Sequence, residues 1–558
     1  MKNWPAFIIL TSGLCLFFSC RNPQDQSNSS LSTEPAVGEK GMVSSAHPKA
    51  TLAGLEILND GGNAFDAAVA VAAVLNVVEP AMSGMGGYGT IVIYDSKKQQ
   101  SRFLNPSSRI PRAVDSDVYR APTQNYLANR RGAKAVSTPG NVHAWEAMSK
   151  EYGNLEWKNL FDPAIRLAEE GFEINSSLSH LIKRAFSSFP EHAQIVYSQN
   201  GEPLKNGDRL IQKDLARSLK LIAWKGASVF YEGEVGRAVD KAMQEAQGFL
   251  SIQDLKSDKA EWWEPVSITY HGFKVITASP PATAFPSLIR LGMMSQFDNR
   301  ELEHNSAEYL HRFAEVTKHA FWCRLAYAGD PDFTPPPLDR LLSESYWEKE
   351  VQKIDLNKAQ PFQYPEASEN KIAHTTHFVV ADQWGNIVCA TQTLGNAFGS
   401  RIMPQGTGIW LNNSLAYCTF EPKGNPMDAH AGHHKLSGDC PTLILKEGKP
   451  WAALGTPGGH TIGQTVPQMV INLIDFEMNI QKAISAPRIS FIEPNDLAVE
   501  KSIPKDVIEK LQQLGHDIRE VQSIGNAHGL TIQYNSKGKP IRFFGGSDPR
   551  GEGLARGF

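Results

Sequence analysis

The chain has 558 residues and a formal net charge of −4, from 55 Lys and Arg against 59 Asp and Glu. Hydrophobic residues make up 41% and charged residues 20%, which excludes a mainly disordered chain and supplies enough apolar material for a large core. Because there is no excess of basic residues, the composition argues against a nucleic-acid partner.

The N-terminus predicts an export signal. Lys2 precedes an almost wholly apolar run over residues 6–18, too short to span a bilayer but as long as a signal-peptide core. The run ends in Phe-Phe-Ser-Cys, which resembles the lipobox of bacterial lipoproteins and makes Cys20 the lipidation site. We expect residues 1–20 to be a lipoprotein signal peptide and residues 21–40 a flexible tether. An ordinary secretory signal with an incidental cysteine is the alternative. The lipobox predicts an exported lipoprotein, anchored on the periplasmic or cell-surface side of a membrane.

The first half of the chain is expected to be mainly helical. Helical spacing of apolar residues predicts helices over residues 46–59, 64–78 and 307–327, residues 141–296 look mainly helical, and a strand is expected over residues 90–94. Residues 352–374 contain two prolines and little periodicity, which indicates an exposed loop.

Gly84, Gly86 and Gly89 match the pattern GxGxxG of dinucleotide-binding loops. Such a loop follows a strand and opens a helix, so that the pyrophosphate meets the helix N-terminus. Here the expected order is helix, glycines, strand. We therefore interpret the glycines as a tight turn with close backbone packing and expect neither NAD nor FAD.

A hairpin is expected over residues 375–393, with turn residues around Trp384 and Gly385. Thr375 and Thr393 are equally far from Trp384, so they should face each other across the two strands. Opposed threonines are close enough to exchange hydroxyl hydrogen bonds. The pattern permits a catalytic site, although paired threonines also simply stabilise strands.

Histidines gather further on, at His430, His433 and His434. Their spacing could hold a metal, but no HExxH motif is present and the flanking residues favour a solvated loop. A metal-dependent hydrolase is therefore the lowest-ranked alternative, and we expect no metal site.

The C-terminal part changes to strands over residues 442–445 and 451–454, followed by a helix over residues 461–475. The connection, residues 455–460, reads Gly-Thr-Pro-Gly-Gly-His. Glycines at a helix start let backbone N–H groups point at an anion, as an oxyanion hole requires. Alone this motif is weak, since strand–helix turns often contain glycine.

The cysteines outside the N-terminal signal are Cys323, Cys389, Cys418 and Cys440, widely spaced and without a CxxC pair. We expect them to be small buried residues, not a disulfide framework. Strands followed by helices, without regular βαβ alternation, predict a layered α+β fold.

The chain resembles the γ-glutamyltransferases, also called glutathione hydrolases, a family of N-terminal-nucleophile hydrolases. The likeness runs from Gly41 to Phe558. It rests on stretches in family order and spacing: GMV from Gly41, LEIL from Leu55, GGNAFDAA from Gly61, PAIRLAEEG from Pro163, GDPDF from Gly329, PGG from Pro457 and SDPR from Ser547.

This resemblance implies a four-layer αββα sandwich and a precursor that cuts itself between His374 and Thr375. The products would be a large chain, residues 41–374, and a small chain, residues 375–558, forming one interleaved unit. Thr375 would then be the nucleophile and its new α-amino group the base, with no cofactor. The resemblance also implies that Thr393 orients the nucleophile and that Gly458 and Gly459 donate to the oxyanion.

The glutamate-binding positions depart from the family pattern. Ser107 stands where the family has the arginine that binds the α-carboxylate, and Tyr417 where it has the aspartate that binds the α-amino group. The family's asparagine and glutamine are replaced by Gly395 and Ser414, and one serine of a pair by Gly438. Asn413 and Ser437 remain as substrate-binding candidates. Arg109 or Arg112 could replace the lost arginine only if the loop is shifted.

We therefore expect an amide hydrolase or acyltransferase whose acyl group is smaller or less charged than γ-glutamyl, acting on a small-molecule amide or peptide. A genuine γ-glutamyltransferase or glutathione hydrolase is the alternative. A further alternative is a non-catalytic, lipid-anchored binding protein, although retention of Thr375, Thr393, Gly458 and Gly459 argues against it.

Overall fold

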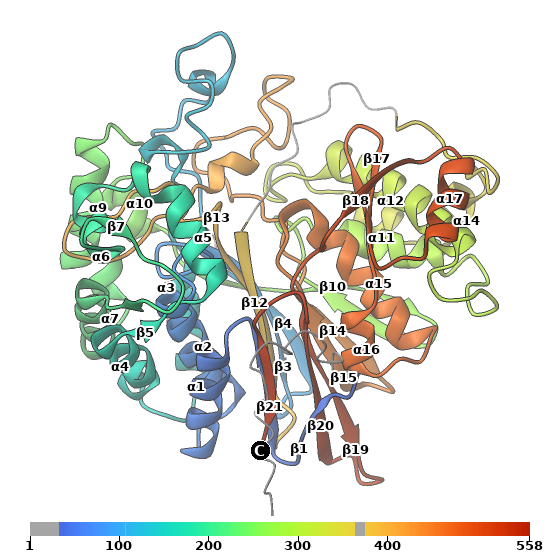
Figure 1. The fold of residues 1–558 in the computed structure, drawn as a ribbon, viewed down its shortest axis with the longest axis horizontal. Helices are drawn as coiled ribbons and strands as arrows, with labels where there is room; N and C mark the ends of the chain where they lie inside the picture. Colours follow the sequence, from blue (N-terminus) through green and yellow to red (C-terminus); the bar gives the residue numbers. More distant parts are fainter. Residues whose placement is uncertain (1–32, 107, 363–373) are drawn as a thin grey trace, which may run out of the picture. The chain divides into compact units, whose positions relative to one another are not determined.

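The computed structural model describes residues 33–106, 108–362 and 374–558. Two seven-stranded antiparallel sheets form its centre (Figure 1). The first sheet has the order β21 (Leu554–Gly557), β2 (Gly41–Ser45), β12 (His374–Asp382), β13 (Ile387–Gly395), β3 (Tyr88–Asp95), β4 (Gln100–Asn105), β9 (Glu261–Trp263). The second has the order β1 (Ala36–Gly38), β20 (Pro540–Ser547), β19 (His528–Tyr534), β15 (Lys449–Gly455), β14 (Thr442–Lys446), β11 (Phe273–Thr277), β10 (Val266–Tyr270).

The helices form two outer layers (Figure 1). Beside the first sheet lie α1 (Pro48–Asn59), α2 (Ala64–Val78), α3 (Asn141–Tyr152), α4 (Asp162–Glu170), α5 (Ser176–Ala185), α6 (Glu191–Val196), α7 (Lys213–Lys225), α8 (Ser228–Tyr231), α9 (Glu234–Glu245) and α10 (Ile252–Ser257). Beside the second lie α11 (Phe285–Met294), α12 (Ala307–Tyr327), α13 (Leu338–Leu341), α14 (Glu344–Val351), α15 (Ile462–Ile474), α16 (Ile480–Ser485) and α17 (Lys505–Gln513). Short strands complete the fold: β5 (Phe172–Glu173), β6 (Ser198–Gln199), β7 (Glu202–Pro203), β8 (Arg209–Leu210), β16 (Ile489–Ile492), β17 (Asp496–Glu500) and β18 (Asp517–Val521).

Three apolar cores hold the layers together. One joins α1 and α2 to the first sheet, a second joins α11, α12 and α15 to the second sheet, and a third lies between the two sheets. Val379 and Cys389 of the first sheet meet Leu443 and Ala453 of the second in this middle core. The expected four-layer αββα sandwich is confirmed.

The helix α2 begins and ends where the sequence predicts. Asn63 caps it by accepting from the N–H groups of Phe65 and Asp66, and the Asp66 carboxylate accepts in return from the Asn63 N–H at 3.0 Å. Every residue of this Ala- and Val-rich helix is buried, which explains why it is apolar on all sides.

The glycines after α2 provide close packing, in the order helix, turn, strand that the sequence predicts. A Cβ atom on Gly87 would lie 2.4 Å from the carbonyl oxygen of Thr393, and one on Gly86 would lie 2.2 Å from that of Trp410. The turn therefore presses directly against the end of β13, and larger residues would force the strand away.

The helical expectation is wrong for part of residues 141–296. The strands β9, β10 and β11 lie there, and the last two are joined by His271 and Gly272, both with positive φ (46° and 85°). The alternating, β-branched segment Val-Ser-Ile-Thr-Tyr is the local signal for this hairpin. The hairpin was not predicted because the region around it is mainly helical.

Several predictions concern residues outside the described ranges: the 1–20 signal, Cys20, Ser107, residues 21–32 of the expected tether and residues 363–373 of the expected loop. Among the described residues, no helix is long and apolar enough to cross a membrane. Cys323, Cys389, Cys418 and Cys440 are buried free thiols, as expected.

Candidate active site

The hairpin β12–β13 carries the proposed nucleophile. Asp382 closes its turn by accepting from the N–H groups of Trp384 at 2.9 Å and Asn386 at 3.0 Å, and Gly385 adopts a φ of 88°. Thr375 and Thr393 are paired residues, as predicted, and Thr393 pairs in turn with Tyr88 of β3. These three residues thus form one row across three strands, and residues in such a row face the same side of a sheet.

The two threonine hydroxyls and one carbonyl form a short chain. Thr375 Oγ1 donates to Thr393 Oγ1 at 3.2 Å, and Thr393 Oγ1 donates to the carbonyl oxygen of His374 at 2.7 Å. The N–H of Gly395 donates to the same Thr393 oxygen at 2.8 Å, which fixes its orientation. Thr393 therefore holds the nucleophile hydroxyl and polarises the carbonyl of the preceding peptide bond at once.

The ionisable groups nearest this chain are buried. His377, two residues along β12, hydrogen-bonds to Thr391 Oγ1 at 2.8 Å, and burial lowers its pKa well below the usual value. On the opposite face of the strand, Thr376 Oγ1 donates to Glu79 at 2.8 Å. Burial raises the pKa of Glu79 to about 7. Neither group hydrogen-bonds to Thr375 among the described residues, which leaves the base to the α-amino group that cleavage would create.

The glycine-rich turn lies on the second sheet, between β15 and α15, as expected from the sequence. Gly458 and Gly459 have positive φ (138° and 59°), and a Cβ on Gly455 would lie 2.4 Å from the His377 ring. The end of β15 therefore packs directly on β12, two residues from Thr375. This arrangement brings the turn to the nucleophile's end of the hairpin.

A polar cluster lies over Tyr88. Ser437 Oγ donates to Asp439 at 2.7 Å, and Thr90 Oγ1 lies 3.3 Å from both Ser437 Oγ and the Asp439 carboxylate. The Lys435 ammonium lies 3.2 Å from the centroid of the Tyr88 ring and 5.2 Å from that of Tyr417. Lys435 is buried, and its nitrogen has no hydrogen-bond partner among the described residues. Burial lowers the pKa of Lys435 and raises that of Asp439.

Sequence reasoning places Ser437 and Tyr417 in this region but misses Lys435, Tyr88 and Asp439. The signal available was the Lys-Leu-Ser-Gly-Asp segment itself, in which two charged residues flank a substrate-binding candidate. Because Tyr88 and Lys435 are far apart in sequence, only the packing of the two sheets shows that they meet.

Asn413 is buried, and main-chain groups occupy its amide. Its Oδ1 accepts from the Asn396 N–H at 2.8 Å, and its Nδ2 donates to the Arg130 carbonyl at 2.7 Å. A Cβ on Gly395 would lie 2.2 Å from Asn413 Oδ1, so the family's asparagine at that position does not fit this arrangement. In this structure Asn413 positions the loop after β13, and its contact with substrate stays a prediction.

The histidine segment forms a loop, as expected, but His434 is buried, so the expectation of a solvated loop is wrong for this residue. The His434 ring lies 3.1 Å from Asp330 and 3.4 Å from Glu261. Burial disfavours the charged ring, but the two carboxylates raise the pKa of His434 to about 9. Arg109 binds the same Glu261 at 3.3 Å and the Gly432 carbonyl at 3.2 Å, so its guanidinium is already engaged.

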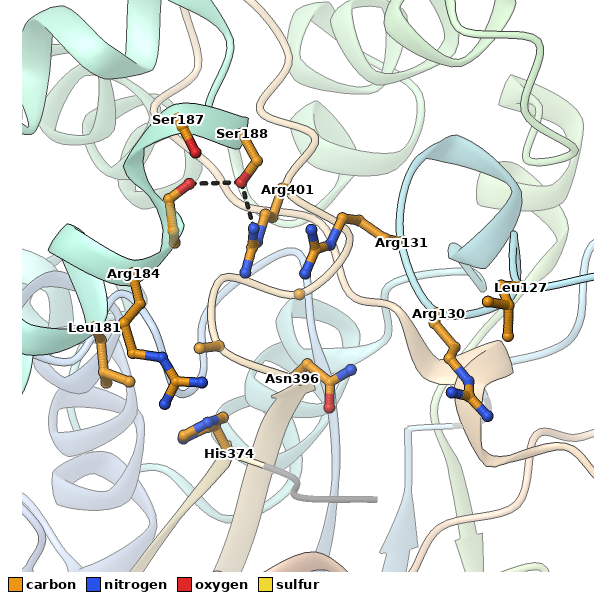
Figure 2. A pocket seen from close by; sticks show the side chains of 13 residues that line it. Leu127, Arg130, Arg131, Leu181, Arg184, Ser187, Ser188, His374, Asn396 and Arg401 are labelled. Carbon is orange, nitrogen blue, oxygen red and sulfur yellow. Dashed lines mark hydrogen bonds between the residues drawn. The ribbon is translucent and has the colours of Figure 1, made fainter. Parts of the chain in front are cut away.

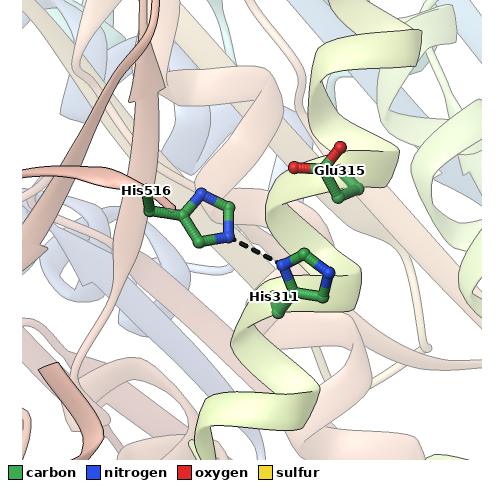
Figure 3. A group of neighbouring side chains, drawn as sticks. All are labelled: His311, Glu315 and His516. Carbon is green, nitrogen blue, oxygen red and sulfur yellow. Dashed lines mark hydrogen bonds between the residues drawn. The ribbon is translucent and has the colours of Figure 1, made fainter. Parts of the chain in front are cut away.

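A second histidine cluster lies away from the hairpin, between α12 and the segment before β18 (Figure 3). His311 and His516 share a hydrogen bond of 2.8 Å, and the other nitrogen of His311 lies 2.9 Å from the carbonyl of Asp355. Glu315 is paired with Lys318 at 2.7 Å. Protein groups contact both ring nitrogens of His311 and the carboxylate of Glu315. We therefore interpret the cluster as a structural network.

The comparisons with known proteins agree with this geometry. The family model described as Gamma-glutamyltranspeptidase matches residues 50–558. The chain is 35% identical over 525 residues to the glutathione hydrolase proenzyme of Bacillus subtilis strain 168, covering 88% of this chain and 89% of that protein. It is 34% identical over 520 residues to the acylase ACY 1 proenzyme of Pseudomonas sp. strain V22, covering 90% and 92%. The crystal structure of a cephalosporin acylase from Bacillus halodurans is similar with a TM-score of 0.86 and 27% identity, over 98% of this chain and 99% of that one.

Proposed function

Since the chain belongs to the gamma-glutamyltranspeptidase family of self-processing N-terminal-nucleophile hydrolases, we propose that Thr375 is its nucleophile in both self-cleavage and turnover. The observation that carries this proposal is the chain of hydrogen bonds from Thr375 through Thr393 to the His374 carbonyl. In the uncut chain it joins the attacking hydroxyl to the bond that must break.

Self-cleavage follows from this geometry. Thr375 Oγ1 attacks the His374 carbonyl carbon, and Thr393 stabilises the oxygen on which charge develops. The C–N bond then breaks, the nitrogen takes the proton that Oγ1 has lost and becomes the α-amino group of Thr375, and an ester joins His374 to Oγ1. Water hydrolyses this ester and leaves a carboxylate on His374. The large chain then ends at residue 374 and the small chain begins at Thr375.

Turnover repeats the attack on an external amide. The α-amino group of Thr375 takes the proton from Oγ1, since its reference pKa near 8 suits a base at neutral pH. The substrate's amine leaves with that proton, and water or a second amine releases the acyl group. In this proposal, N–H groups of Gly458 and Gly459 donate to the oxyanion, supported by the approach of β15 to β12.

The acyl pocket is proposed to disfavour an α-amino acid head group. Tyr417 stands at the position of the family's amine-binding aspartate, and the Lys435 ammonium lies 5.2 Å from its ring centroid. Because burial lowers the pKa of Lys435 to about 7, a substrate ammonium placed there would meet a like charge below that pH, in a buried site where repulsion is weakly screened. Acyl groups smaller or less charged than γ-glutamyl avoid this cost. The proenzyme relatives named glutathione hydrolase favour the alternative, a genuine γ-glutamyl enzyme.

Export and a lipid anchor on Cys20 complete the proposal. They rest on the apolar run and lipobox-like sequence of residues 1–20. We expect the Cys20→Ala protein to lose the mass of the lipid and its association with membranes. An unchanged mass would refute the anchor.

Intact mass of the protein lacking residues 1–20 tests the nucleophile. We expect two chains, the smaller beginning at Thr375, and a single uncut chain from Thr375→Ala. Thr393→Val should process at least tenfold more slowly, because it loses the donor to the His374 carbonyl, whereas Thr393→Ser should retain most of the rate. A single uncut chain from the parent protein would contradict the proposal and favour the binding-protein alternative.

A further inference from the structure

A pocket of about 720 Å³ opens beside His374, on the α5 side of the first sheet (Figure 2). Figure 2 shows the guanidinium groups of Arg131, Arg184 and Arg401 around it, with His374 and Asn396 below them. Four arginines and no acidic residue are among the described residues that line it. Arg131, Arg184 and Arg401 therefore give it a positive charge.

The three arginines come from separate segments. Arg184 lies at the end of α5, Arg131 lies two residues before the 3-10 helix Ala133–Ala135, and Arg401 lies within the loop that follows β13. No carboxylate among the described residues forms an ion pair with Arg131, Arg184 or Arg401. Burial and the neighbouring charges of Arg131 and Arg184 lower the pKa of Arg401 to about 10. Mutual repulsion of this kind is relieved by an anionic ligand.

The loop that carries Arg401 is held in an unfavourable backbone conformation. Phe398 and Arg401 both have positive φ (59° and 63°), and a Cβ on Gly399 would lie 2.1 Å from the Leu411 carbonyl. Arg401 also donates to Ser188 Oγ, which directs its guanidinium toward α5. Backbone strain of this kind is typical of sites that serve a ligand.

The pocket lies on the other side of the nucleophile from the Lys435 cluster. Thr375 shares a row with Thr393 and Tyr88, whereas Thr376 contacts Glu79 on the opposite face and His374 lines the arginine pocket. His374 directly precedes Thr375 and lines the arginine pocket, so the pocket lies beside the nucleophile. We propose that the arginine pocket binds a carboxylate, or a comparable anion, on the amine half of the substrate.

This inference rests on the proposed amide hydrolysis and names its substrate class: amides of an amine that carries an acid group. Guanidinium groups suit this task because each can donate two parallel hydrogen bonds to a carboxylate. A carboxylate could also come from the protein itself, since self-cleavage creates one on His374. The experiment below separates the two sources.

Two substrates differing only in charge test the pocket: N-butanoyl-4-aminobenzoate and its neutral carboxamide. For the processed protein, kcat/KM should be at least tenfold higher for the acid. Arg184→Gln and Arg401→Gln should bring the two values together, by lowering the value for the acid more than the value for the carboxamide. Arg166→Gln, which removes an exposed arginine paired with Glu56, is the matched control and should keep the preference.

Equal kcat/KM values for acid and carboxamide in the parent protein would overturn the inference. It would also fall if the arginine variants instead lowered activity on 4-carboxybutanoyl-anilide relative to butanoyl-anilide, since the anion would then lie on the acyl half.

Calorimetric binding of 4-aminobenzoate needs no turnover. Arginine-dependent binding to the processed protein supports the pocket even if no amide is hydrolysed, in which case only the proposed function fails. Binding to uncut Thr375→Ala but not to the processed protein would assign the pocket to the His374 carboxylate and overturn the substrate assignment.

Discussion

At the residue scale, two side chains define what the site can do. Thr393 has one hydroxyl with three partners, and those partners are the nucleophile, the carbonyl of the preceding bond and a fixing N–H. Lys435 has a buried ammonium with aromatic rings beside it and no hydrogen-bond partner among the described residues. In the proposed function, Thr393 directs the attack on the bond, and Lys435 restricts which acyl group can be placed there.

Replacing Lys435 by Met removes the buried charge and keeps the length of the side chain. Two substrates are compared: γ-glutamyl-4-nitroanilide and 4-carboxybutanoyl-4-nitroanilide, which lacks the α-amino group. We expect the ratio of their kcat/KM values, first over second, to rise about tenfold in the variant, which corresponds to about 1.4 kcal/mol. Lys446→Met is a suitable control, because Lys446 also lies over an aromatic ring, at 5.4 Å from Phe273, on the second sheet. An unchanged ratio in Lys435→Met would show that Lys435 does not discriminate against the amine.

Glu79 gives a pH dependence of stability whose sign can be worked out. Its pKa in the folded protein is about 7, raised by burial, against about 4.3 in an unfolded chain. Between these values the folded state holds a proton that the unfolded state has lost, so stability falls as pH rises from about 4.3 to 7.

Urea unfolding of the uncut Thr375→Ala protein at pH 5 and pH 7.5 measures this effect. As the pH rises from 5 to 7.5, the free energy of unfolding of Glu79→Gln should increase relative to that of the parent, because the variant lacks the carboxyl group that must ionise. Buried histidines act in the opposite direction, but they cancel in the difference between the two proteins. Glu56→Gln, at an exposed position, should behave like the parent. The same pH dependence in parent and Glu79→Gln would contradict the assignment.

At the element scale, the hairpin β12–β13 is the part that sequence reasoning predicted in most detail. The turn residues fix its centre, and the centre fixes the pairing of Thr375 with Thr393, because register in a hairpin follows from its turn. The helices at 64–78 and 307–327 were predicted to the residue because apolar periodicity and flanking caps mark their ends. The hairpin β10–β11 was missed, since its two strands are short and lie between helical stretches.

Asp382 holds this hairpin to the helix beneath it. Besides closing the turn, its carboxylate accepts from the Ala64 N–H at 2.9 Å and from Asn386 Nδ2 at 2.8 Å. Negative charge at a helix N-terminus is stabilising, and the buried donors would be left unpaired without it.

In the uncut Thr375→Ala background, Asp382→Ala should lower the free energy of unfolding by about 3–5 kcal/mol and Asp382→Asn by less. Urea unfolding of the three proteins measures both changes. Asp95→Ala, on the neighbouring strand β3, serves as a comparison, because this carboxylate contacts groups of its own turn: the N–H groups of Lys97 and Lys98 and, at 3.9 Å, the Lys98 ammonium. An Asp382→Ala protein as stable as its parent would refute the role of this contact.

At the scale of the whole molecule, the site is made where two sheets meet. Thr90 of the first sheet and Ser437, which leads into the second, are 347 positions apart in sequence yet 3.3 Å apart in space. Local patterns cannot give such a contact, because it depends on how two complete sheets pack. The four-layer arrangement came from the family resemblance, whereas the arginine pocket, the Lys435 cluster and the engagement of Asn413 by main-chain groups required the structure.

The order of strands in the first sheet has a consequence for the life of the protein after cleavage. The strand β2 would belong to the large chain, yet it is hydrogen-bonded on one side to β12 and on the other to β21, both in the small chain. The uncut precursor can thread β2 between its neighbours as a single molecule, at a rate independent of dilution. After the cut, the same arrangement requires two separate polypeptides to find each other. An unfolded mature enzyme would therefore recover by a bimolecular route, slowest where the protein is most dilute, so that its architecture is in practice assembled once.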